Sequence, residues 1–344
     1  MRFYLYILSL FLVSGCANIV APSGGVKDMA PPKLIDLKIE NTGKHHIISF
    51  MFDEYIQFAN WQNNFFISPP LSNPVEKKIN KKTLTIIINE SIQKDKKYYI
   101  NLNNCIKDFN EGNIMLELDH SFSINKSHDT LSLQGNVKDA YNTKPLNGVW
   151  VMIFEDAAND SSIFYSKPEY ISKTNDLGEF HFPNLSYANY KICALSGDDL
   201  YYHDGDKIAF INNLINPIYD SLILLNLFEP NIKTEDSLLL DDTNTIDHKN
   251  NGTISINSNQ NTPALFELIK NDRIINYYYF TEPPFILKNI PADTYTIKYT
   301  YDKNNDKRWT TGSWENRRQP EKTEIYDNIT VKPNWDIKLD WFNN

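Results

Sequence analysis

The chain has 344 residues, of which 41% are hydrophobic and 13% aromatic, and its formal net charge is −9. This length allows two or three domains with cores of their own. The negative charge argues against nucleic-acid binding, which requires clustered Lys and Arg, and against electrostatic attachment to an anionic membrane surface.

An apolar run of ten residues, "YLYILSLFLV" at 4–13, lies near the start of the sequence. It is too short to span a bilayer but suits the apolar region of a signal peptide. The following "VSGC" at 13–16 resembles a bacterial lipobox. The resemblance implies cleavage after Gly15, diacylglycerol on the sulfur of Cys16 and acylation of the new amino terminus. We therefore expect a lipoprotein signal peptide at 1–15; the alternative is an ordinary secretory peptide.

A lipid on Cys16 predicts permanent membrane attachment, because two or more acyl chains anchor a protein stably. Ala17 stands where inner-membrane lipoproteins commonly carry aspartate, which favours the outer membrane. Residues 16–30 are rich in small residues and Pro, as in a flexible tether. Their single acidic residue, Asp28, favours the periplasmic face over the cell surface, although both faces stay open.

Short β-rich runs follow the tether at spacings near ten residues: "KLIDLKIE", "HHIISFMF", "KTLTIIINE" and "KKYYINLNN". This spacing, with turn residues between the runs, predicts a β-sandwich. The segments at 48–58, 81–113 and 120–124 resemble an SbsA-type Ig-like module, so the first sandwich is placed at 31–125. In its "IKDFNEGN" segment, Asp108 and Gly112-Asn113 are expected to form a turn.

A second unit is indicated by "QGNVKD", "GVWVMIF" and "TNDLGEFHFPNLSYANYKICAL". This order of motifs resembles the carboxypeptidase regulatory-like, prealbumin-type sandwich, a non-catalytic accessory module, and the unit is placed at 126–228. Asp176 to Gly178 suit a hairpin turn.

The same pattern returns later in the chain, since "FHFPNLSYANYKICAL" (180–195) aligns without gaps on "FILKNIPADTYTIKYT" (285–300). Asn184 then matches Asn289, and Tyr190 matches Tyr295. A repeat at this distance predicts a second prealbumin-like sandwich at 250–344, behind an acidic linker at 229–249. The predicted fold class is therefore all-β, with one Ig-like and two prealbumin-like β-sandwiches in tandem.

The order of these modules resembles an Ig-like-domain lipoprotein family of Bacteroidetes. Further matching features are "APSGGVKD", "PPKL", "KPEY" at 167–170, and "QPEK" with "NWDIKLDW" near the end. The resemblance implies a cell-envelope location and no established chemistry.

Cys105 and Cys193 fall in different predicted sandwiches. We expect two buried free thiols and no disulfide.

Asp302, Asn304 and Asp306 occupy positions 1, 3 and 5 of a loop that is similar to a calcium-binding loop. Lys307 stands where such a loop requires Gly, and Ser313 stands where a bidentate Glu is required. We therefore favour an Asx-rich loop without metal and expect no cofactor, with Ca²⁺ as the weaker alternative.

Four of the six tryptophans lie near the C-terminal end. Trp335 and Trp341 are expected to pack in the core. Trp309 and Trp314 lie among polar residues, so we expect them to be exposed; with Arg317 and Arg318 they form a candidate patch for binding a protein or a sugar.

Catalytic constellations are weak in this sequence. Asp53 and Glu54 are adjacent in a predicted strand, so their side chains should point to opposite faces, and the same holds for His45 and His46. Asp198-Asp199 and "HDGD" at 203–206 are the better enzyme candidate, although no further ligands follow at a recognised spacing. We expect a solvated loop there, not an active site.

These observations predict a non-catalytic lipoprotein of the outer membrane that acts as a structural or protein-interaction scaffold, with an outer-membrane or periplasmic protein as partner. An accessory role in a complex that assembles or exports outer-membrane β-barrels is the leading specific hypothesis. A carbohydrate- or peptidoglycan-binding module is the alternative, and a hydrolase is the weakest of the three. No small-molecule substrate is predicted, and the partner's identity and the oligomeric state stay open.

Overall fold

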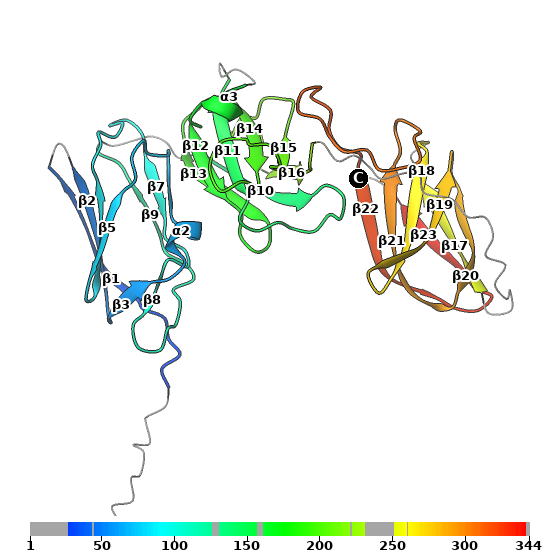
Figure 1. The fold of residues 1–344 in the computed structure, drawn as a ribbon, viewed down its shortest axis with the longest axis horizontal. Coiled ribbons are helices and arrows are strands. Elements are labelled where there is room, and N and C mark those ends of the chain that lie inside the picture. Colours follow the sequence, from blue (N-terminus) through cyan, green and yellow to red (C-terminus); the bar gives the residue numbers. More distant parts are fainter. Residues whose placement is uncertain are drawn as a thin grey trace, which may run out of the picture.

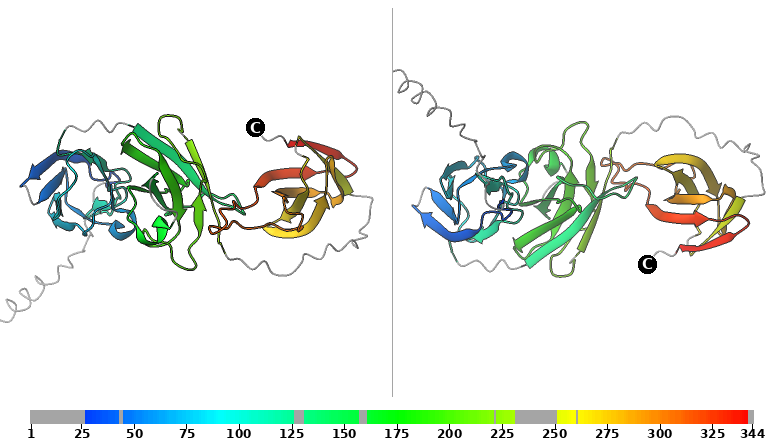
Figure 2. Two further views of the ribbon diagram at one scale, coloured as in Figure 1. Left: turned by 90° about the horizontal axis from the view of Figure 1, so that it is seen from above. Right: turned by 90° about the horizontal axis from the view of Figure 1, so that it is seen from below.

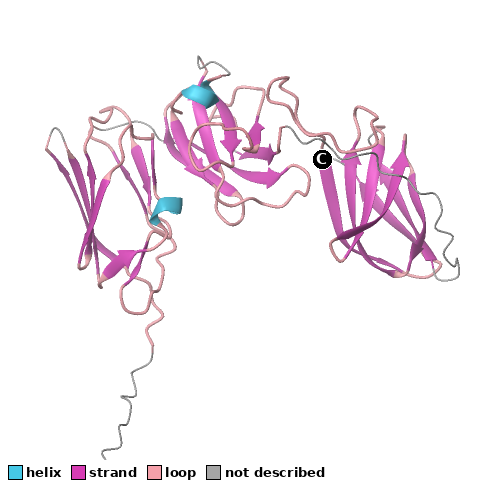
Figure 3. Cartoon of the chain, viewed as in Figure 1, coloured by secondary structure: helices cyan, strands magenta, loops and turns pink. Residues whose placement is uncertain are grey.

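The structure, a computed structural model, describes residues 27–42, 45–125, 131–156, 161–220, 222–230, 251–259 and 261–341. The described chain folds into three β-sandwiches arranged one after another (Figure 1). Its described helices are single turns, α2 (Trp61–Asn64) and α3 (Ser162–Tyr165) (Figure 3). The predicted all-β tandem-sandwich fold is thus confirmed. None of the described helices has the length and apolar character needed to cross a membrane. The predicted signal peptide and Cys16 lie outside the described residues.

The first sandwich is built from strands β1 to β9. A four-stranded sheet has the order β1-β2-β6-β5, a three-stranded sheet the order β4-β7-β9, and β3 pairs with β8. The strands are β1 (Leu34–Asn41), β2 (His46–Phe52), β3 (Ile56–Phe58), β4 (Phe66–Ser68), β5 (Glu76–Asn80), β6 (Thr83–Ile88), β7 (Tyr98–Asn101), β8 (Ile106–Asp108) and β9 (Asp119–Phe122).

Alternating side chains explain this first core. In β6, Leu84, Ile86 and Ile88 are fully buried, and the residues that alternate with them, Thr83, Thr85 and Ile87, are half-buried. This is the period of two expected of a strand that covers a core. Edge strand β5 carries Glu76, Lys77 and Lys78 on exposed positions, which discourages pairing with a further strand.

The second sandwich contains β10 to β16 and the third contains β17 to β23. The second has sheets β13-β10-β16 and β12-β11-β14-β15; the third has β20-β17-β23 and β19-β18-β21-β22. The second sandwich comprises β10 (Leu131–Asp139), β11 (Trp150–Glu155), β12 (Tyr170–Lys173), β13 (Glu179–Leu185), β14 (Tyr190–Leu195), β15 (Ile208–Phe210) and β16 (Leu222–Leu227). The third comprises β17 (Asn251–Ser258), β18 (Ala264–Lys270), β19 (Arg273–Phe280), β20 (Phe285–Pro291), β21 (Asp293–Tyr301), β22 (Thr323–Val331) and β23 (Asp336–Trp341).

The strand orders of these two sandwiches are the same, which confirms the predicted repeat. The last strand of each, β16 or β23, runs parallel to the first, β10 or β17. Asn184 and Asn289 both adopt a left-handed backbone conformation, with φ of 59° and 60°. The hydroxyl groups of Tyr190 and Tyr295 each donate to a main-chain carbonyl four residues earlier, at 2.9 Å in both cases. The repeat therefore extends to individual hydrogen bonds.

The local expectations for Trp335 and for Asp53 and Glu54 were wrong. Trp335 is 59% exposed, because β23 begins only at Asp336 and the tryptophan falls in the preceding turn. Asp53 and Glu54 are not strand residues, since β2 ends at Phe52. The chain bends after that strand and turns Glu54 toward Asp108, as described below.

Cys105 and Cys193 are free, buried thiols, as predicted. Burial raises the pKa of both to about 12. Because the thiolate is the reactive form, we expect neither to react with a thiol reagent in the folded Cys16→Ser variant at pH 8, whereas both should react promptly in denaturant. A colorimetric thiol assay checks this, and rapid reaction of one thiol without denaturant contradicts the described packing.

Candidate functional site

The first junction, between the first and second sandwiches, joins strands β4, β7 and β9 to β12 and β13. The main-chain N–H of Ile171 donates to the Ser68 hydroxyl at 3.0 Å. The Lys173 ammonium donates to the carbonyl of Asn63 at 2.7 Å. The amide of Asn184 donates to the Ser121 hydroxyl at 2.8 Å. Hydrogen bonds from β4, β9 and helix α2 of the first sandwich thus cross this junction.

An aromatic contact fills the centre of the first junction. Phe66 meets Trp150 edge-to-face at 5.8 Å, and the Lys173 ammonium lies 4.4 Å from a Trp150 ring centroid. Phe66 is buried in a cluster that otherwise contains residues of the second sandwich and Trp309 of the third. Packing of this kind holds neighbouring domains in one arrangement more firmly than a polar contact does.

Two segments that carry the family resemblance lie at the junctions. In "KPEY", Glu169 forms an ion pair with Lys96 of the first sandwich, and Lys167 donates to the Ser72 hydroxyl at 3.3 Å. In "QPEK", the Gln319 amide donates to the Phe210 carbonyl of the second sandwich at 3.0 Å. These segments therefore contribute to domain association.

The second junction, between the second and third sandwiches, is formed by two segments, each of which extends from one sandwich to the other. The loop at 302–322, between β21 and β22, extends to the second sandwich, and the turn after β10 extends to the third (Figures 1 and 2). The Thr311 hydroxyl donates to the Glu229 carbonyl at 2.7 Å, and the Thr323 hydroxyl donates to the Ala140 carbonyl at 2.9 Å.

A buried ion pair lies under the turn after β10. Glu267 in β18 and Lys298 in β21 are each 3% exposed, and the Lys298 ammonium lies 2.9 Å from the Glu267 carboxylate. The Tyr141 hydroxyl, from the second sandwich, donates to both carboxylate oxygens at 3.0 and 3.2 Å. Burial lowers the pKa of Lys298 to about 8, although Glu267 opposes this shift. The pair is therefore closed off from water partly by the neighbouring sandwich.

The predicted tryptophan patch is part of this second junction. Trp309 is only 7% exposed and contacts Tyr141 edge-to-face at 5.2 Å, so the expectation that it is exposed was wrong. Trp314 is half-buried and packs on Phe210 at 4.9 Å, under the Arg317 guanidinium at 4.2 Å. Arg318 is exposed and donates to the Thr311 carbonyl. Trp309, Trp314 and Arg317 thus contact the chain's own second sandwich.

The candidate calcium loop is held together by hydrogen bonds between its own residues. The Asp302 carboxylate accepts main-chain hydrogen bonds from Asp306 and Lys307, and the Asn304 carbonyl oxygen accepts one from Asp306. The Asp306 carboxylate accepts from Thr310, Asn304 and Arg308. This is the arrangement of an Asx-rich loop. Calcium binding here stays the weaker alternative to the favoured loop without metal.

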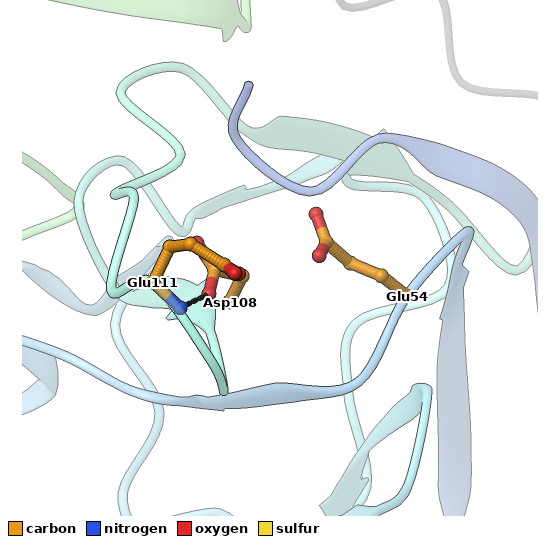
Figure 4. A group of neighbouring side chains, drawn as sticks. All are labelled: Glu54, Asp108 and Glu111. Atoms are coloured by element: carbon orange, nitrogen blue, oxygen red, sulfur yellow. Dashed lines mark hydrogen bonds between the residues drawn. The ribbon is translucent and has the colours of Figure 1, made fainter. Parts of the chain in front are cut away.

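One group of acidic side chains was missed in the sequence. Carboxylate oxygens of Glu54, Asp108 and Glu111 lie within 4.8 Å of one another (Figure 4). Burial and then the Asp108 charge raise the pKa of Glu54. The Asp108 carboxylate, however, already accepts hydrogen bonds from the chain itself. Its donors are the main-chain N–H groups of Glu111, Gly112 and Asn113, at 2.5, 2.9 and 2.6 Å. It forms the predicted turn, and the group by itself does not define a metal site.

This turn also holds the start of the described chain. The Asn113 side-chain amide donates to the carbonyls of Asp28 and Ala30 at 3.1 Å each. The turn at 108–113 therefore fixes the direction in which the predicted tether leaves the first sandwich.

We expect Asp108→Asn to destabilise the first sandwich by about 2–3 kcal/mol at pH 7, because one acceptor oxygen becomes a donor that faces main-chain donors. Burial alone raises the pKa of Asp108, but the main-chain donors outweigh it and hold the pKa below its ordinary value. The carboxylate's contribution is therefore fully present above about pH 4 and lost as the pH falls through the lower pKa of the folded state. Denaturant unfolding at pH 7 and pH 3 checks this, and an equal difference between wild type and variant at both values contradicts it.

The segment that was the better enzyme candidate, Asp198-Asp199 with residues 203–206, is a solvated loop. The side chain of His203 is 64% exposed, and its Nδ1 lies 3.7 Å from oxygens of both Asp199 and Asp206. Asp206 also accepts the main-chain N–H of His203 at 2.8 Å, as in an ordinary turn. Within the described residues, ligand atoms of this loop do not form a group of three within 4.8 Å of one another.

The fold and these contacts define a chain of joined β-sandwiches. Residues 28–124 match the family model of the bacterial Ig-like domain, and this match covers the first sandwich. Ig-like modules of this kind are generally non-catalytic structural units. Among curated protein sequences, none matches this chain.

Solved structures with similar modules share little sequence with this chain. The Bacillus anthracis TIE protein is 13% identical, with 89% of this chain and 57% of that chain covered and a TM-score of 0.19. GBS52, the minor pilin of Streptococcus agalactiae, is 12% identical over 62% of this chain and 95% of that one, with a TM-score of 0.21. Fervidolysin from Fervidobacterium pennivorans is 9% identical over 66% of this chain and 37% of that one, with a TM-score of 0.23. Scores this low carry no inference about function.

Proposed function

We propose that this chain is a non-catalytic scaffold lipoprotein, anchored in the outer membrane through lipid on Cys16. In this proposal it is an accessory subunit of a complex that assembles or exports outer-membrane β-barrels. The observation that carries the scaffold role is the pair of junctions, which hold three sandwiches in one arrangement with Phe66 and the Glu267–Lys298 pair buried between them. Such a chain presents distant surfaces to a partner at fixed spacing.

A comparison within the repeat supports a protein partner. In the third sandwich, last strand β23 carries the charged residues Asp336, Lys338 and Asp340 on its exposed positions. The equivalent strand β16 of the second sandwich instead exposes Leu222 and Leu224, which are 68% and 54% accessible. Charged residues protect a sheet edge from association, whereas exposed leucines favour it.

The proposal is tested by purification of the tagged full-length protein from native membranes in mild detergent, with mass spectrometry of the co-purifying chains. We expect a partner in stoichiometric amount, and we expect the Cys16→Ser variant to leave the membrane fraction and lose that partner. Recovery of the protein alone contradicts the scaffold role. A Cys16→Ser variant that stays in the membrane contradicts the lipid anchor.

A further inference from the structure

A cleft of about 390 Å³ lies beside the first junction and is not occupied by the contacts that join the sandwiches. The first sandwich contributes Phe66 and residues of β7 and the loop after it, and the second contributes residues from the outer face of β10 and from β12, β13 and β16. Six residues define its polar wall: Tyr99, Asn101, Asn103, Gln134, Asn136 and His181. A volume of this size falls within the range of small-molecule sites.

Side-chain amides dominate the lining of this cleft. Four belong to the polar wall, and a fifth, Asn175, is engaged in its own turn with Leu177 and Glu179. Gln134 and Asn136 make no side-chain hydrogen bond to other described residues, so their donors and acceptors are available to a ligand. Asn101 is 8% exposed and uses one amide hydrogen toward the Asn64 carbonyl at 2.7 Å, which fixes its orientation.

Aromatic rings and balanced charge complete the site. Phe66 and Tyr99 lie with ring centroids 6.1 Å apart, and Leu222, which is 68% exposed, adds apolar surface. The charged lining residues are one lysine, Lys173, and one glutamate, Glu179, with His181 as the remaining titratable base. Burial lowers the pKa of His181, which favours the neutral imidazole.

We propose that this cleft binds a neutral oligosaccharide. A sugar hydroxyl both donates and accepts hydrogen bonds, and a side-chain amide supplies two donors and one acceptor without charge. The apolar C–H face of a sugar ring needs aromatic or aliphatic surface, which Tyr99 and Leu222 provide.

Other ligand classes fit the cleft less well. A phosphate or an acidic sugar favours arginine or several lysines, and this lining has one lysine. An extended peptide is usually captured by a free sheet edge through main-chain hydrogen bonds. Here Gln134 and Asn136, the amides with no partner among the described residues, belong to β10, a central strand whose main-chain groups are already paired with β13 and β16.

The repeat shows that the fold does not require the polar side chains that line the cleft. Asn136 corresponds to Thr253 in the third sandwich, and His181 corresponds to Ile286, while the core positions Phe180 and Phe285 are the same. Thr253 is therefore a matched control position, in an equivalent strand that lies outside the cleft.

The test uses the full-length protein in detergent on an array of neutral and acidic oligosaccharides, followed by calorimetry with the neutral glycan that binds best. We expect at least one neutral glycan to bind, Asn136→Leu to weaken it about tenfold or more, and Thr253→Leu to leave it unchanged. Unchanged melting temperatures show that both variants are folded. Binding of acidic glycans alone, no glycan binding, or equal binding by both variants overturns the proposal.

An extended-peptide library is tested in parallel. If a peptide binds, Asn136→Leu weakens that binding and no glycan binds, the proposal is also overturned. Because the glycan assay needs no protein partner, its failure is distinct from failure of the scaffold proposal.

Discussion

Glu267→Ala is expected to destabilise the third sandwich by about 3–5 kcal/mol, because it leaves the Lys298 ammonium buried without a counter-charge. The lysine is 3% exposed and lies directly under the Tyr141 ring, 2.9 Å from its centroid, so water cannot readily replace the carboxylate. Denaturant unfolding of the full-length protein, followed by circular dichroism, measures the change.

Two controls separate the ion pair from simple loss of volume. The double variant Glu267→Leu/Lys298→Met removes both charges and is expected to recover most of the lost stability. Tyr141→Phe removes the hydroxyl that donates to Glu267 and should cost about 1.5–3 kcal/mol. A Glu267→Ala variant as stable as wild type contradicts a buried pair at the second junction.

Gly135→Ala is expected to destabilise the second sandwich by about 3 kcal/mol or more. A Cβ atom added there lies 2.0 Å from the Ile223 carbonyl oxygen of parallel strand β16 and 2.7 Å from the Phe180 ring. The carbonyl belongs to the main chain and cannot move without separating β16 from β10, so the cost of overpacking is at the upper end of its range.

The repeat supplies a matched variant for this prediction. Gly252 occupies the equivalent position, and its added Cβ lies 2.6 Å from Val331 and 2.7 Å from the Lys332 carbonyl oxygen. Gly252→Ala should therefore destabilise the third sandwich in the same way. Ser132→Ala, at an exposed position of β10, should have little effect. Thermal unfolding compares the three, and equal melting temperatures for Gly135→Ala and Ser132→Ala are inconsistent with the close strand approach.

The strands and the repeat were predictable because they rest on local patterns. Alternation in "KTLTIIINE" marks β6, and the gapless alignment of 180–195 with 285–300 predicted that Asn184 and Asn289 are equivalent. Residue spacing along a strand and turn chemistry are properties of neighbouring residues, so a sequence shows them directly.

The junctions could not be predicted in the same way. Trp309 lies among polar residues in the sequence, and Tyr141, the ring it contacts, is far away along the chain. A signal was present for the ion pair: Glu267 and Lys298 are single charges within the otherwise apolar segments "ALFELI" and "YTIKYTY". Charged residues in such surroundings indicate a buried pair, but they do not indicate that a neighbouring sandwich covers it.

The cleft escaped prediction for the same reason. Asn101 and Asn136 lie in different sandwiches, and each is unremarkable in its own strand. Only the docking of the sandwiches at the first junction brings them to one wall.

The central claim is that the junctions hold the three sandwiches in one arrangement. The most direct test is a pulsed electron-spin measurement of distances between spin labels on neighbouring sandwiches, in the Cys16→Ser background. Exposed labelling positions are Lys78 in the first, Tyr187 in the second and Lys338 in the third sandwich, each changed to Cys and used in neighbouring pairs. We predict one narrow distance distribution for each pair, and a broad distribution in either pair contradicts the claim.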